Sequence, residues 1–153
     1  MSSPTISQVH VPVAGGKKKK VKTPIVKTDA KRGLVWGWAS VSAKSDGSPL
    51  IDRDGDTIPT DVLQDAMLGF MEDYRAGGVM HEGDAEGCVV ESLVVTAEKL
   101  EAMGIPADVA KSIPEGAFIG LKLDPQSDTF KRVESGELGM FSIFGKALIA
   151  EAE

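Results

Sequence analysis

The sequence predicts an α+β fold, a small β-barrel-like sheet with helices packed outside it. Three observations lead to this prediction: β-branched and aromatic residues fill residues 33–43, apolar residues recur at helical spacing over residues 60–74, and further short strand and helix patterns follow without an internal repeat. The chain has 153 residues, of which 42% are hydrophobic and 26% charged. One globular domain with a substantial core fits this length and composition.

Residues 1–32 differ from the rest of the chain in charge. Eight Lys/Arg and one acid give this segment a charge of +7, whereas nine Lys/Arg and 22 acids give residues 33–153 a charge of −13. A lysine run at Lys17–Lys22 repels itself, and Pro, Ser and Gly are scattered around it. We therefore predict a flexible basic N-terminal arm over residues 1–32 and a folded domain over residues 33–153, although "SQVHVPV" within the arm can still dock as a strand.

The acidic domain argues against a broad nucleic-acid surface, because phosphate binding needs clustered Lys/Arg on a folded face. Any contact with nucleic acid is expected to be weak and to come from the Lys17–Lys22 arm. The alternative for this lysine run is a solvated tail without a ligand.

The first strand is expected over residues 33–43, where Trp36 and Trp38 share one face, and "KSDGSP" ends it. A helix follows, with Thr60 placed to cap its start and Gly77-Gly78 placed to end it. Its apolar face consists of Leu63, Ala66, Met67, Phe70, Met71 and Tyr74.

Residues 79–95 are expected to form a hairpin, with a short strand through His81, a Gly-rich loop over residues 82–87 and a strand over residues 88–95. The remaining elements are one or two short helices broken at Gly104 and Pro106, a strand over residues 117–123, a short helix in which Phe130 and Val133 face inward, and a last strand within residues 139–150.

The composition excludes several kinds of site. Cys88 is the one cysteine, so no internal disulfide can form, and with His10 and His81 it gives too few ligands for a structural zinc. The stretch "DRDGD", residues 52–56, fails as a calcium loop because the sixth and twelfth positions hold Thr57 and Leu63. We expect no metal and no organic cofactor. The low cysteine content and the lack of a long apolar run predict an intracellular protein that is not inserted in a membrane.

Three residues are candidates for nucleophilic catalysis. Ser142 lies between aromatic residues in "GMFSIFGKA", so it is either a packed hydroxyl or a nucleophile on a rigid strand. His81 lies in the folded region beside a Gly-containing loop, and it is either a general base or a structural histidine. Glu91 is an acid within the apolar strand "CVVESLVV" and is either the partner that orients His81 or an exposed residue of an edge strand.

Two points qualify this set. If His81 pairs directly with Cys88 in the hairpin, Glu91 points to the opposite face, and a one-residue bulge or an asymmetric loop would restore its position beside His81. Cys88 is an alternative nucleophile, because a thiolate beside a histidine is a recurrent pair, whereas a buried inert cysteine is the commoner case.

Several blocks of the sequence resemble a known family. The stretches "DRDGDTIPTDVLQDAMLGFMEDYR", "GVMHEG", "VVESLVV" and "AFIGLKLDPQSDTFKRVESGELGMFSIFGKA" are similar, in this order, to the phage prohead (head maturation) serine proteases, in particular the XkdF-like phage proteases. The resemblance covers roughly residues 33–148. It implies a fold related to the herpesvirus assemblin proteases and an endopeptidase that cleaves scaffold and capsid proteins inside the assembling head.

By this resemblance the nucleophile is Ser142 of "FSIFG", the base is His81 of "MHE" and the acid is Glu91 of "VVES". The resemblance also implies a location in the host cytoplasm, inside the phage prohead or virion, no cofactor, the scaffold and major capsid proteins as substrates, and a homodimer as one possible assembly.

The chain departs from the family pattern at Phe144, where relatives often carry a second Gly, so the oxyanion donors are left unassigned. The terminal "ALIAEAE" resembles small-apolar-x-Glu cleavage sites and is expected to mark self-cleavage if the chain is a processed form. The alternative function is a catalytically inactive protein of the protease fold that serves as a capsid-associated or scaffold-binding component.

Overall fold

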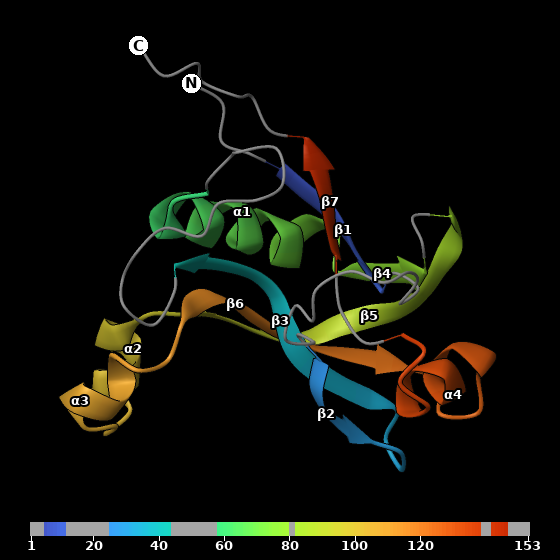
Figure 1. Ribbon diagram of the computed structural model, residues 1–153. Helices are drawn as coiled ribbons and strands as arrows, with labels where there is room; N and C mark the ends of the chain where they lie inside the picture. The colour runs from blue at the N-terminus through green and yellow to red at the C-terminus, as the bar shows by residue number, and fades with distance from the viewer. Residues whose placement is uncertain (1–4, 12–24, 44–57, 80–81, 139–141, 147–153) are drawn as a thin grey trace, which may run out of the picture.

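Figure 1 shows the computed structural model, which describes residues 5–11, 25–43, 58–79, 82–138 and 142–146. The strands of this described part are β1 (Thr5–Val11), β2 (Ile25–Asp29), β3 (Leu34–Ala43), β4 (Ala76–Val79), β5 (Glu82–Val95), β6 (Glu115–Leu123) and β7 (Ser142–Lys146). Its helices are α1 (Thr60–Asp73), α2 (Ala97–Ala102), α3 (Ala107–Ala110) and α4 (Asp128–Glu134). The mixture of helices with one sheet agrees with the predicted α+β class.

The strands form one sheet in the order β2-β3-β6-β5-β4-β1-β7. The β1/β4 pair is parallel and the other pairs are antiparallel. A barrel closes only when its two edge strands pair with each other. The edges here are β2 and β7, and although β7 comes near β3, the hydrogen-bonded order is open. The expectation of a barrel-like sheet is therefore wrong, and the relation to assemblin folds stays a prediction.

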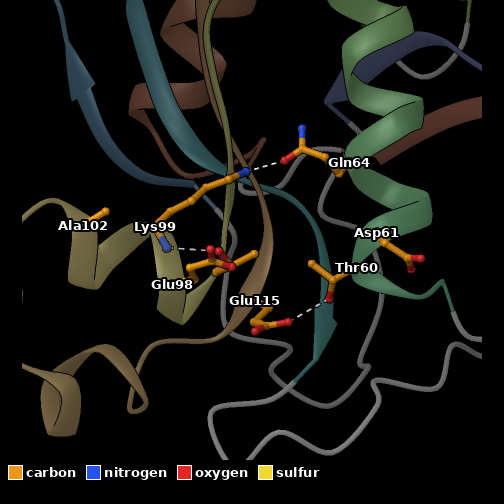
Figure 2. A pocket seen from close by; sticks show the side chains of 8 residues that line it. Thr60, Asp61, Gln64, Glu98, Lys99, Ala102 and Glu115 are labelled. Carbon is orange, nitrogen blue, oxygen red and sulfur yellow. Dashed lines mark hydrogen bonds between the residues drawn. The ribbon is translucent and has the colours of Figure 1, made fainter.

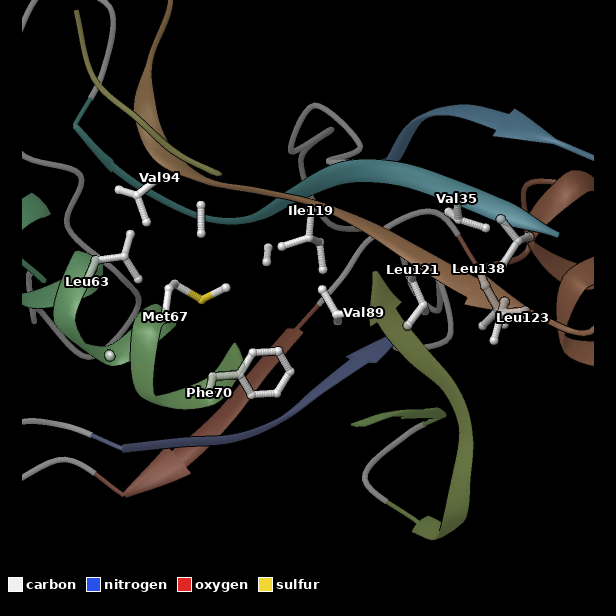
Figure 3. Packing of buried hydrophobic residues seen from close by; sticks show 14 of the residues in the cluster. Val35, Leu63, Met67, Phe70, Val89, Val94, Ile119, Leu121, Leu123 and Leu138 are labelled. Atoms are coloured by element: carbon white, nitrogen blue, oxygen red, sulfur yellow. The ribbon is translucent and has the colours of Figure 1, made fainter. Parts of the chain in front are cut away.

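The main core lies between α1 and the β3/β6/β5 part of the sheet (Figure 3). Helix α1 buries one face, and the strands present their alternate residues to it. The fully buried side chains of the largest volume are Phe70, Phe130, Leu63, Met67, Ile119, Leu121, Leu138, Val35 and Val89. The predicted apolar face of the helix is confirmed at Leu63, Ala66, Met67 and Phe70, whereas Met71 is half-buried and Tyr74 is exposed.

Both predicted boundary signals of α1 are wrong. The N-cap residue is Pro59, and Thr60 is the first helical residue, whose hydroxyl donates to Glu115 Oε2 at 2.8 Å instead of capping the helix. The helix ends at Asp73, before the two glycines, and Arg75 takes a left-handed conformation with φ 53° while its N–H donates to the carbonyl of Phe70. Gly77 and Gly78 are instead residues of the interior strand β4.

The segment 1–32 contributes two strands to the sheet, so it is not an arm throughout. The strand predicted as an option in "SQVHVPV" is present as β1, which pairs with both β4 and β7. Strand β2 pairs with β3 at the other edge. Removal of residues 1–32 would therefore remove two strands of the sheet. The lysine run at Lys17–Lys22 lies outside the described residues, as does the calcium-like stretch at residues 52–56.

The β2/β3 connection is a tight turn held by Asp29 and Arg32. Arg32 donates from its backbone N to Asp29 Oδ1 at 3.1 Å and from Nη1 to Asp29 Oδ2 at 2.9 Å. The side-chain hydrogen bond from Arg32 holds the pKa of Asp29 below its ordinary value. Gly33 completes the turn with φ 72°, and a Cβ there would lie 2.0 Å from the carbonyl oxygen of Leu123, so only glycine fits.

The hairpin that follows α1 differs from the prediction. Residues 82–87 belong to β5 and do not form a Gly-rich loop, and Cys88 pairs with Ala76. His81 and its neighbour at position 80 lie outside the described residues. The described pairing of β4 with β5 includes Val79 opposite Glu82.

The other helices agree with their predictions. Helices α2 and α3 are separated at Gly104, which has φ 93°, and at Pro106, the N-cap residue of α3. They bury Leu100 and Ala110 against Trp38 and Phe118. Helix α4 buries Phe130 and Val133. Figure 1 shows α2 and α3 together at one end of the sheet and α4 at the other. No helix in the described ranges is long and apolar enough to cross a membrane.

Two leucines of α1 provide a matched test of the core. Leu63 is 1% exposed and Leu68 is 52% exposed. Leu63→Ala is expected to lower the free energy of unfolding by about 2–5 kcal/mol, because it removes buried methyl groups and leaves a cavity. Leu68→Ala is expected to change it by less than about 0.5 kcal/mol. Urea denaturation of both variants measures the difference, and equal losses would contradict the described packing of α1.

Candidate active site

Ser142 begins β7, and the backbone of this strand pairs with β1. In the β1/β7 register Ser142 lies opposite His10, Ile143 opposite Val9 and Phe144 opposite Gln8. The predicted last strand is therefore confirmed over residues 142–146. Residues that lie opposite each other in an antiparallel pair have Cα atoms about 4.5–5.5 Å apart, so His10 is a direct neighbour of Ser142 in the sheet.

His81 lies outside the described residues, but its flanking strands are placed. Val79 is the last residue of β4 and pairs with Val11 of β1 on one side and with Glu82 of β5 on the other. Strand β1 lies between β4 and β7 in the sheet. The described backbone therefore separates the β4/β5 hairpin from Ser142 by a strand that itself carries a histidine.

Glu91 has a definite partner, and it is not a histidine. The indole Nε1 of Trp36 donates a hydrogen bond to Glu91 Oε2. Trp36 on β3 and Glu91 on β5 both lie opposite Gly120 of β6, so the hydrogen bond crosses this glycine. A Cβ at position 120 would lie 2.8 Å from Glu91 Oε2 and 3.0 Å from Trp36 Nε1, so the missing side chain leaves room for the contact.

A register shift occurs in the pairing of β5 with β6. The register shifts between Val89 and Glu91, and this shift places Val89 opposite Leu121 on the core side and Glu91 opposite Gly120 on the outer side. Cys88 lies opposite Ala76 and Lys122, so the described register does not contain the direct His81–Cys88 pairing that would have turned Glu91 to the opposite face.

Glu91 is also distant from Ser142 in the sheet. Strands β5, β4, β1 and β7 are successive neighbours, and three strand spacings of about 4.8 Å place β7 about 14 Å from β5 in a flat sheet. The outer face that carries Glu91 is the face opposite α1, and Glu91 is exposed there. The described contacts thus give Glu91 a structural role at Trp36, while its role in a triad stays a prediction.

Cys88 is an exposed free cysteine, which excludes the alternative of a buried inert thiol. Its Sγ lies 3.6 Å from the carbonyl oxygen of Val89. The two strand neighbours of Cys88 are not histidines, so the described structure does not form the thiolate–histidine pair that would make it a nucleophile.

The sequence analysis missed His10 as a candidate because it treated residues 1–32 as an arm. A signal was present, since "QVHV" alternates polar and apolar residues at the period of a strand. The structure places this stretch as β1 between β4 and β7. His10 is therefore a residue of the sheet and not of a flexible arm.

A pocket of about 500 Å³ lies between the start of α1, helix α2 and the start of β6 (Figure 2). It is lined by Thr60, Asp61, Gln64, Thr96, Glu98, Lys99, Ala102 and Glu115. Lys99 Nζ donates to Gln64 Oε1 and, at 2.7 Å, to the carbonyl oxygen of Val94. Ser42 Oγ lies 2.7 Å from Thr60 Oγ1, which donates to Glu115.

These hydrogen bonds join four elements of the fold around the pocket. Thr60 of α1 is tied to Ser42 of β3 and Glu115 of β6, and Lys99 of α2 is tied to Gln64 of α1. A buried polar group is retained at low free-energy cost when its hydrogen bonds are satisfied, and Ser42 meets this condition. The pocket lining contains none of the three predicted catalytic residues, so we assign the network to the support of the fold.

No group of three or more metal-ligating side chains occurs among the described residues. The chain matches a family described as "Putative phage serine protease XkdF", which aligns with its residues 20–151. No significant match was found among curated proteins or among solved structures. The matched segment contains Ser142, His81 and Glu91, but it begins after β1 and so excludes His10.

The contact between Trp36 and Glu91 is testable by a double-mutant cycle. Trp36→Phe removes the indole donor and Glu91→Ala removes the acceptor. We expect a coupling free energy of about 0.5–1.5 kcal/mol in urea denaturation, since the variants remove one shared hydrogen bond. Trp38→Phe with Glu91→Ala is the control pair, because Trp38 packs edge-on against Phe118 with ring centroids 5.3 Å apart and is expected to couple weakly to Glu91. Equal coupling in both cycles would contradict the contact.

Proposed function

The chain belongs to the phage serine protease family of the XkdF type, and we propose that it is a serine endopeptidase that cleaves scaffold and capsid proteins during prohead assembly. The observation that carries this proposal is the family match over residues 20–151, which includes the strand that begins at Ser142. The match covers most of the chain, so the proposal concerns the whole folded domain and not an isolated motif.

In the proposed reaction the Ser142 hydroxyl attacks the carbonyl carbon of the scissile peptide bond while a histidine takes its proton. The histidine returns the proton to the leaving amine as the C–N bond breaks, and an acyl-enzyme remains. Water then repeats the sequence, with its proton passing through the histidine and the acyl group leaving Ser142. The family resemblance assigns this base to His81 and the orienting acid to Glu91.

The position of Ser142 in the sheet supports a polypeptide as the substrate. Strand β7 is an edge of the described sheet and hydrogen-bonds to a single strand, β1. An exposed strand edge can pair with an extended peptide through main-chain hydrogen bonds. A substrate strand added beside β7 would bring its backbone alongside the residue proposed as the nucleophile. Location in the prohead and assembly as a homodimer remain predictions from the resemblance.

The proposal is tested by co-expression of the chain with the scaffold and major capsid proteins of its own phage, followed by intact-mass spectrometry. We expect specific cleavage products with the wild type and none with Ser142→Ala, because the acyl-enzyme cannot form. Ser92→Ala, the same substitution at an exposed serine of β5, is the matched control and should leave the products unchanged.

Equal cleavage by wild type and Ser142→Ala would contradict the assignment of the nucleophile. Absence of cleavage in both, with both proteins folded and bound to scaffold or capsid, would favour the alternative of an inactive capsid-associated component.

A further inference from the structure

The outer face of the sheet, opposite α1, carries apolar side chains at positions where a face turned to water usually carries polar ones. In the β3/β6/β5 register Trp38, Phe118 and Leu93 lie side by side in one row across the three strands. Helices α2 and α3 pack against Trp38 and Phe118. Leu93 remains 38% exposed, and Leu34 and Trp36 are half-buried on the same face of β3. Part of this apolar face is therefore accessible.

Two lysines accompany these apolar residues. Lys27 of β2 lies opposite Trp36, with its Nζ 5.8 Å from the centroid of the indole ring, and Lys122 of β6 lies two residues from Gly120 on the same face. In the described part of the chain neither lysine takes part in an ion pair. Glu91, the acid in these rows, accepts the hydrogen bond of Trp36. The outer face thus has more cations than anions, although residues 33–153 together carry a charge of −13.

The exposed side of α1 has the opposite charge. Asp61, Asp65, Leu68 and Glu72 recur at i, i+4, i+7 and i+11, so they form one stripe along the helix, and all four are exposed. The helix contains no Lys or Arg. Glu72 and Asp73 lie in its last turn, where the negative end of the helix dipole disfavours acids. The stability of the helix therefore does not explain these acids.

The two surfaces also match in spacing. Lys27 and Lys122 lie two strands apart and two residues apart along the strands, so their Cα atoms are about 12 Å apart in a flat sheet. Asp65 and Glu72 are seven residues apart on α1, which gives about 10.5 Å along the helix axis. Leu68 lies between the two acids, just as apolar residues of β3 lie between the two lysines.

We propose that α1 of one copy of this chain docks on the outer face of the β3/β6/β5 strands of a second copy. Leu68 packs on the accessible apolar residues, and Asp65 and Glu72 face the two lysines. The contact joins two different surfaces on opposite sides of the sheet, so it repeats from copy to copy and does not close as a symmetric pair. This inference goes beyond the proposed function and does not depend on protease activity.

The test measures the weight-average mass of the full chain by analytical ultracentrifugation at increasing concentration. We expect the mass to rise beyond that of a dimer, and the association to weaken at high salt because the charge pairs are screened. Asp65→Lys with Glu72→Lys should weaken association by about tenfold or more, since like charges then face each other across the contact. This double change takes the net charge from −6 to −2, so general repulsion between copies falls and cannot cause the loss.

A second variant reverses the charge of the other surface. Lys27→Glu with Lys122→Glu should also weaken association. Lys111→Glu with Lys131→Glu is the control, because it gives the same net charge of −10 and alters lysines that are exposed on other elements, so it should retain most of the association. Mixing the two interface variants in equal amounts should restore association, since the lysines of one α1 then face the glutamates of the other outer face.

The outcomes decide between modes of assembly. A wild type that stays monomeric up to millimolar concentration would overturn the proposal and leave the serine protease proposal unaffected. Association that persists in the α1 variant would overturn it in favour of an outer face packed on itself. Loss of association in both variants without recovery in the mixture, with both variants folded by circular dichroism, would also overturn it, because complementary surfaces must restore each other.

Discussion

The apolar face of α1 is the surface on which the rest of the described structure is built. Leu63, Met67 and Phe70 are almost completely buried, and the helix contacts β3, β5 and β6 as well as β1. Burial of a large apolar side chain contributes about 1.5–3 kcal/mol, so one such face gives a substantial part of the stability of a domain this size. Because α1 also touches β1, the same packing supports the strand that lies beside Ser142.

The two faces of the sheet have separate roles. The inner face holds the apolar core, while the outer face carries a row in which Trp36 reaches across Gly120 to Glu91. Lys27 Nζ lies 5.8 Å from the centroid of the Trp36 ring, so the tryptophan is bounded by a cation and a carboxylate. The acid within an apolar strand is thus explained by an indole partner on the outer face of the sheet.

The sequence was sufficient where local patterns decide the structure and insufficient where distant strands meet. The helix period predicted the buried face of α1, period-two alternation predicted β3, and short apolar runs predicted β6 and β7. Parity showed that a contact between Glu91 and His81 would need a bulge or an asymmetric loop, but the observed register shift lies in the pairing of β5 with β6. It could not be predicted, because the pairing of Glu91 with Gly120 depends on residues about thirty positions later. The stop of α1 was misplaced because Arg75, and not a glycine, takes the left-handed conformation.

For the candidate site too, one part could be predicted from the sequence and another could not. Ser142, His81 and Glu91 were chosen by residue type and family resemblance, and the family match includes all three positions. The pairing of His10 with Ser142 could not be predicted from the sequence. The charge of residues 1–32 predicted an arm and gave no information on which strands β1 would join. Pairing between chain segments separated by more than one hundred residues is a property of the assembled sheet and has no local signal.

The insertion of β1 between β4 and β7 is the central claim, and nuclear Overhauser effects between backbone protons of β1 and β7 test it most directly. In isotopically labelled full-length protein, we predict cross-strand effects between His10 and Ser142 and between Gln8 and Phe144, since backbone protons of paired strands lie close together. Random-coil chemical shifts over residues 5–11, without these cross-strand effects, would contradict the pairing.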